Sequence, residues 1–109
     1  MDDILNTYIY EIKKGTKPLA LISVCNEKLE KCLDKISKNA LSFAVQKIEG
    51  KANIFFGSED CIRVVSLFID KKLSDLSAEE DFILGIMLGY NRIEQCKRYM
   101  NNKILQPVG

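Results

Sequence analysis

The sequence predicts an α+β fold, in which a small three-stranded sheet has helices on one face and is followed by a C-terminal helix pair. Three observations support this prediction. Apolar residues recur at helical spacing near both ends of the chain, in residues 2–14 and 77–100. Residues 19–24 form a nearly continuous apolar run, which is the pattern of a buried strand. Two segments of alternating polarity, 41–48 and 52–56, flank a Glu-Gly-Lys turn.

The first half of the chain contains, in order, a helix, a strand and a second helix. Residues 2–14 form the first helix, and Gly15 can end it. Pro18 prevents the helix from continuing into the strand at 19–24. Asn26 is the predicted N-cap of the next helix. The inward residues of that helix are Leu29, Cys32, Leu33 and Ile36.

The second half begins with the β-hairpin formed by 41–48 and 52–56, and three helices follow it. Ser58 is the predicted N-cap of the first of these helices, and residues 71–76 connect it to the final pair. Strand, helix and hairpin together define a βαββ core, half of a ferredoxin-like arrangement, whose crossover should be right-handed. At this length we expect one domain, residues 1–109.

The least polar stretch of the chain starts at Ser77. Ser77 and Glu80 have the spacing of a capping box, and the helix that follows is apolar all round. Such a helix is buried on all sides, so it is either a central core helix or one that a second subunit completes. Its candidate interface residues are Phe82, Ile83, Leu84, Gly85, Leu88, Gly89 and Tyr90.

A second cap follows at once, because Asn91 and Glu94 again have the capping-box spacing. The helix after it is amphipathic, and Glu94 and Arg98 form an outward pair four residues apart. We expect its inward residues to be Ile93, Cys96, Tyr99 and Met100. The two helices therefore form an αα unit with a very short turn.

Composition excludes several functional classes. The net charge is +1, so no bulk attraction to nucleic acid or to a membrane is expected. The chain has no histidine, which removes the commonest general base and metal ligand. The four cysteines form no C-x-x-C pair and match no zinc spacing. The sequence therefore predicts no enzyme, no metal site and no cofactor.

Cys25 is the candidate reactive thiol, because it lies where a buried strand meets a helix N-terminus. An inert small apolar residue is the alternative interpretation. The apolar segment 82–90 is much shorter than the roughly 20 residues that span a bilayer. The start of the chain, Met1-Asp2-Asp3, lacks the basic and apolar regions of an export signal. We therefore expect a cytoplasmic protein with reduced thiols.

A rival hypothesis treats residues 84–100 as a DNA-binding helix-turn-helix, in which Asn91, Arg92 and Gln95 would read bases. Two observations argue against it. The inward residues of its second helix lie one position later than that motif requires. Residues 77–109 also carry balanced acids and bases, without the excess of cations that phosphate binding needs. Nucleic-acid binding is thus disfavoured.

Several segments resemble the bacterial domain-of-unknown-function family 2023. They are YEIKKG at 10–15, NIFFG at 53–57, and EEDFILGIMLGY at 79–90 followed by QCKRY at 95–99. The resemblance covers nearly the whole chain, and its C-terminal motif is the specific part. It implies three strands, five helices and a homodimer, with no established activity and a loose association with flavodoxin-type electron carriers.

These observations favour one hypothesis, a cytoplasmic homodimeric interaction or regulatory module without catalytic activity. The alternatives are a DNA-binding protein that uses the C-terminal helix pair and a thiol-based redox protein that uses Cys25.

Overall fold

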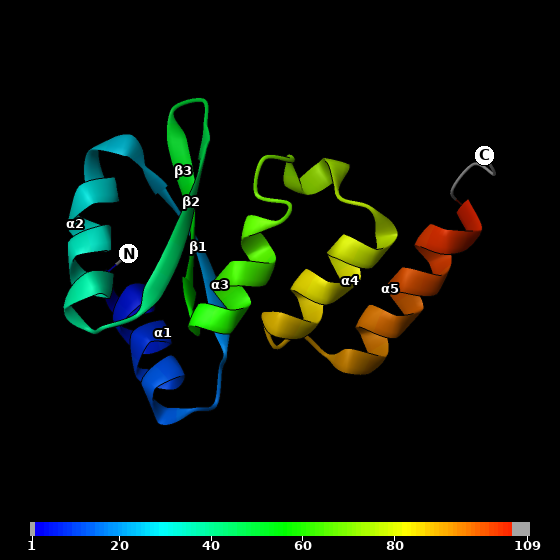
Figure 1. The fold of residues 1–109 in the computed structure, drawn as a ribbon, viewed down its shortest axis with the longest axis horizontal. Helices are drawn as coiled ribbons and strands as arrows, with labels where there is room; N and C mark the ends of the chain where they lie inside the picture. The colour runs from blue at the N-terminus through cyan, green and yellow to red at the C-terminus, as the bar shows by residue number, and fades with distance from the viewer. Residues whose placement is uncertain (1, 106–109) are drawn as a thin grey trace.

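The computed structural model describes residues 2–105, which form three strands and five α-helices (Figure 1). The predicted α+β class and three-stranded sheet are confirmed. The elements, in chain order, are α1 (Asp2–Lys14), β1 (Leu19–Cys25), α2 (Asn26–Lys38), β2 (Ser42–Ile48), β3 (Lys51–Gly57), α3 (Glu59–Ser66), a 3-10 turn η1 (Leu73–Asp75), α4 (Ala78–Met87) and α5 (Arg92–Leu105).

The sheet has the strand order β1-β3-β2, and both pairings are antiparallel. Ile54 at the centre of β3 pairs with Ile22 on one side and Val45 on the other. The hairpin turn between β2 and β3 contains Gly50 at a φ of 78°, a conformation that glycine adopts without steric cost. β1 and β2 therefore run parallel to each other and are joined through α2, as the predicted βαββ core requires.

Helices cover both faces of the sheet, so the prediction of helices on one face is wrong. Ile54 and Phe56 of β3 pack in a core with α1 and α2. Phe55, between them in sequence, packs in a second core with α3 and α4. Figure 1 shows α1 and α2 on one side of the strands and α3 on the other. Because successive side chains of a strand point to opposite faces, the consecutive apolar residues of β3 require two covered faces.

The start of α2 differs from the prediction by one residue. Cys25, not Asn26, is the N-cap residue, with an extended backbone and no capping hydrogen bond from its side chain. The physical reason is that β1 continues to Cys25 and passes directly into the helix. No loop residue is left over to act as a separate cap.

A chain of polar side chains crosses the sheet on the α3 side. Ser23 of β1 donates to Asn53 Oδ1 at 2.5 Å, and Asn53 Nδ2 donates to Gln46 Oε1 of β2 at 2.9 Å. Gln46 Nε2 in turn donates to the backbone oxygens of Ile69 and Lys71, at 3.0 and 2.5 Å. Asn53 and Gln46 are buried. These bonds hold the segment that leads to α4 against the sheet.

We predict that Asn53→Ala destabilises the fold by about 2–3 kcal/mol, because it leaves the buried Gln46 amide oxygen without its donor. Ser23→Ala, at the exposed end of the same chain, should cost less than about 1 kcal/mol. Urea unfolding followed by circular dichroism measures both values. Equal losses from the two substitutions would show that Asn53 does not hold the chain together.

Candidate interaction surface

Helix α4 begins with the predicted capping box. Ser77 Oγ accepts from the backbone N–H of Glu80 at 3.1 Å, and the N–H of Ser77 donates to Glu80 Oε1 at 2.9 Å. Glu80 also forms an ion pair with Lys71 at 2.8 Å. The hydrogen bond from Lys71, and then that from the Ser77 backbone, lower the pKa of Glu80 below its ordinary value. The start of this helix is thus fixed both to its own cap and to the preceding segment.

The single chain does not bury α4 on all sides. Leu84 and Leu88 are buried and pack into the α3 core. Ile83 and Tyr90 are exposed. Because only the Leu84–Leu88 side meets the sheet layer, part of the apolar surface of this segment is left outside the core. The interpretation of α4 as a central core helix is therefore wrong for one copy of the chain.

The turn between α4 and α5 reverses the chain within a few residues. Gly89 lies at a φ of 80°, and its N–H bonds to the Ile86 oxygen, while the N–H of Tyr90 bonds to the Gly85 oxygen. This pair of bonds is a Schellman motif. Asn91 Oδ1 then accepts from the N–H of Glu94 at 3.0 Å and caps α5, as predicted.

Helix α5 packs on α4 with its polar side. Gln95 lies so close to Gly85 that a β-carbon at Gly85 would collide with the Gln95 amide. Arg98 makes a two-pronged ion pair with Asp81, with distances of 2.6 and 3.1 Å. Gly85 thus leaves room for the Gln95 side chain in the contact between the two helices, and the ion pair fixes their alignment.

Aromatic and acidic groups extend the same contact. The Tyr99 ring lies 5.2 Å from the Phe82 ring, measured between centroids. The Tyr99 hydroxyl donates to Glu79 Oε2 at 3.0 Å, and Lys103 Nζ lies 2.9 Å from the same oxygen. The hydrogen bonds from Lys103 and Tyr99 lower the pKa of Glu79. Tyr99 is the one predicted inward residue of α5 that faces α4.

This arrangement predicts that acid weakens the α4–α5 contact. Because the pKa of Glu79 in the folded chain is below its ordinary value of 4.5, its contribution is present above that value and is lost as the pH falls below it. The urea midpoint should fall between about pH 6 and about pH 3, and the fall should be smaller in Glu79→Gln. Glu49→Gln, in the hairpin turn, is the matched control. An unchanged pH dependence in Glu79→Gln would contradict this assignment.

The apolar side of α5 faces outward, so the prediction that it faces inward is wrong. Ile93, Met100 and Ile104 are 64%, 55% and 74% exposed, and Cys96 is exposed beside them. Ile104 was not among the predicted inward residues, although its spacing from Met100 continues the same row. We call Ile93, Cys96, Met100 and Ile104 the α5 apolar stripe. In Figure 1, α5 is the outermost element and lies beside α4 alone.

The seven candidate interface residues of α4 and its turn have different surroundings. Leu84, Gly85 and Leu88 are buried within the chain, and Phe82 packs on Tyr99. Three of the seven are exposed, namely Ile83, Gly89 and Tyr90. The surface that one copy offers to a partner therefore lies mainly on α5 rather than on α4.

The residues proposed for DNA binding have structural roles in the α4–α5 contact or lie beside it, and the proposed reactive thiol lies outside that contact. Asn91 caps α5, Gln95 packs on Gly85, and Arg92 is exposed at the start of α5. Cys25 is exposed at the end of β1, far along the chain from the helix pair. Burial raises the pKa of the Cys61 thiol, which is the opposite of activation. Among residues 3–104, whose side chains the structure describes, no group of Cys, Asp and Glu side chains is arranged to hold a metal ion.

None of the helices within residues 2–105 has the length and apolar character needed to cross a membrane. A search of curated proteins gave no match. A family model, described as a protein of unknown function (DUF2023), matches residues 3–102. This range contains all three strands and nearly all of the five helices. The chain therefore belongs to the DUF2023 family.

Proposed function

We propose that this chain is a cytoplasmic, non-catalytic interaction module that works as a homodimer, and that two copies join through the α5 apolar stripe. One observation supports this most directly: α5 uses its polar side to contact its own chain and leaves its apolar side in solvent. A helix in a stable monomer does the reverse. Burial of apolar surface drives association as it drives folding, so the stripe is placed to be covered by a partner.

The shape of the chain agrees with this proposal. Its radius of gyration is 14.6 Å, whereas a compact domain of this length has about 13 Å. Helix α5 lies at one end of the molecule, away from the sheet (Figure 1). A twofold contact through α5 would bring the apolar stripes of two copies together. This contact would also leave the sheet of each copy, and the helices that cover it, free for other contacts.

The stripe is suited to a second copy of itself. In an antiparallel contact about a twofold axis, residues at equal distances from the midpoint meet each other. Ile93 then lies opposite Ile104 of the partner, and Glu94 lies opposite a lysine, Lys103. Met100 meets Lys97, whose aliphatic stem can cover apolar surface while its ammonium stays in water. The antiparallel helix dipoles also attract each other.

Light scattering across about 1–100 µM protein tests the proposal, since this range spans ordinary dimer affinities. We expect the mass of a dimer. A short bis-maleimide should also join Cys96 to Cys96 of the partner in a Cys25→Ser background, where Cys25 can no longer react. A monomer at every concentration, without cross-linking, would overturn the homodimer. The stripe would then need a different protein, and a flavodoxin-type carrier would be the first to test.

A further inference from the structure

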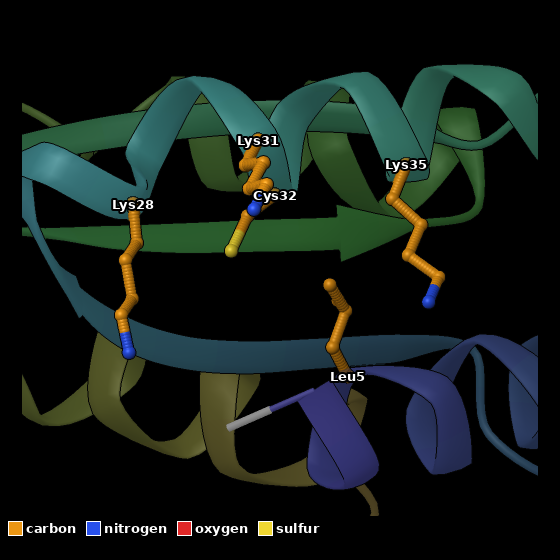
Figure 2. Close-up of a pocket in the computed structure, with 5 residues that line it drawn as sticks. All are labelled: Leu5, Lys28, Lys31, Cys32 and Lys35. Carbon is orange, nitrogen blue, oxygen red and sulfur yellow. The ribbon is translucent and has the colours of Figure 1, made fainter.

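A pocket of about 380 Å³ lies between α1 and α2, and three lysines of α2 line it. Figure 2 shows Lys28 and Lys35 extending from α2 at the two ends of the pocket, with Leu5 of α1 and Cys32 between them. Lys31 completes the lining near the middle. The pocket therefore has an apolar centre and a row of ammonium groups.

Most of the charges of helix α2 form two rows. The three pocket lysines recur at i, i+3 and i+7, which places them within about 60° of the helix circumference, and the fourth lysine, Lys38, ends the helix between the two rows. The acids Glu27, Glu30 and Asp34 form a second row of similar width, displaced by about 100°. Because the lysine row is the one beside the pocket, the positive charge of this helix is concentrated there.

Among the described side chains, those of residues 3–104, these lysines have no ion-pair partner. Lys31 lies four residues after Glu27 and three before Asp34, spacings at which helical ion pairs form. The four ion pairs of the described residues all lie between Lys71 and Lys103 instead. No carboxylate of the described residues lines the pocket. The positive charge is thus left for an external anion.

A second surface pocket provides the contrast. It too has three lysines, Lys47, Lys51 and Lys72, but Glu49 and Asp70 line it with them. Those carboxylates offset two of its three positive charges. The pocket beside α1 has the same number of lysines, but no acid is among its described lining residues. The two pockets therefore differ in their carboxylates and not in their number of lysines.

The length of the lysine row indicates which anion fits. Seven residues of helix separate Lys28 from Lys35, a rise of about 10 Å. With Lys28 and Lys35 extended at the two ends of the pocket, as in Figure 2, a chain of linked phosphates matches the lysine row better than a single phosphate does. Lysine binds phosphate oxygens as a flexible point charge, without the fixed fork of arginine. We propose that this pocket binds a linear oligophosphate group, either free or as the triphosphate of a nucleotide.

Titration of the full chain with inorganic tripolyphosphate, followed by calorimetry at about 50 mM salt, tests this proposal because screening is weak there. We expect saturable one-to-one binding and a raised unfolding temperature. The Lys28, Lys31 and Lys35→Gln triple variant should bind at least about tenfold more weakly, since each lost ammonium removes a charge-assisted hydrogen bond. A parallel titration with a nucleoside triphosphate separates the two sources. Equal affinity assigns the site to the phosphate chain, and tighter binding assigns it to the nucleotide.

The matched control replaces Lys47, Lys51 and Lys72 with Gln and so removes the same net charge from the other pocket. Its affinity for tripolyphosphate should stay within about twofold of the parent, because screening keeps distant charges weak. Equal loss in both triple variants would mean that net charge alone attracts the anion, which overturns the site. Orthophosphate at matched ionic strength should give at least about tenfold weaker binding, since it reaches fewer lysines. Equal binding of the two anions would also overturn it. Dimer mass is independent of all these outcomes.

Discussion

Ile93→Glu is expected to raise the dissociation constant of the proposed dimer by at least about 100-fold, which corresponds to about 2.7 kcal/mol. In the antiparallel contact Ile93 lies opposite Ile104 of the partner, and twofold symmetry places the new carboxylate against that apolar side chain twice. Burying a charge without a partner is costly. The fold itself should be little affected, because Ile93 is exposed in the single chain. Light scattering gives the mass, and circular dichroism confirms that the helices are retained.

Leu67→Glu is the control for this prediction. Leu67 follows α3 and is 83% exposed, yet it lies outside the stripe. The same change of charge and polarity there should leave the dimer intact. If Leu67→Glu dissociates the dimer and Ile93→Glu does not, the contact lies on the α3 side and the assignment to α5 is wrong.

Gly57→Ala is expected to destabilise the fold by at least about 3 kcal/mol, because it adds a steric collision to a strained backbone. Gly57 ends β3 at a φ of 151°. A β-carbon there would collide with the Pro18 carbonyl oxygen and lie 3.0 Å from Leu19 Cα. These are backbone atoms at the start of β1, and the N–H of Ser58 already bonds to the same Pro18 oxygen at 2.9 Å. The backbone of Pro18 and Leu19 cannot move away from Gly57 without disrupting the pairing of β1 with β3.

Gly50→Ala measures the energetic cost of the backbone conformation without the cost of a steric collision. Gly50 also has a positive φ, 78°, but no atom lies within 4 Å of its β-carbon position. The Gly50→Ala substitution should therefore destabilise the fold by only about 1–2 kcal/mol, which is the cost of the left-handed conformation alone. Urea unfolding of both variants compares the two losses. If Gly57→Ala cost no more than Gly50→Ala, close approach to Pro18 would have no energetic importance.

Features that depend on a few neighbouring residues were predictable from the sequence. The Ser77 capping box and the Asn91 cap were both predicted, because each requires only the right side chain three residues from a backbone N–H. The strand bounds agree with the structure to within one residue, since alternation and the Glu-Gly-Lys turn are local signals. Membership of the family was likewise visible in the motif at 79–99.

The burial of both sheet faces could have been predicted from the sequence of β3 alone. Ile54, Phe55 and Phe56 are consecutive and apolar, and a half-exposed strand does not have that pattern. Residues 52–56 were instead predicted as a segment of alternating polarity, which buries one face only. The amphipathic pattern of a helix predicts a buried side, but it does not identify the sheet face that covers it.

Residue identity and short-range spacing were enough to predict the order of helices and strands, the Ser77 and Asn91 caps and the hairpin. The side of α5 that meets the chain depends instead on tertiary contacts. An amphipathic helix has two sides, and its pattern alone favours burial of the apolar one. Here Gly85 admits Gln95, and Asp81 binds Arg98. These long-range contacts hold the polar side against α4 and leave the apolar stripe free. The lysine pocket depends in the same way on α1, because only the packing of Leu5 beside α2 gives the lysine row an opposite wall.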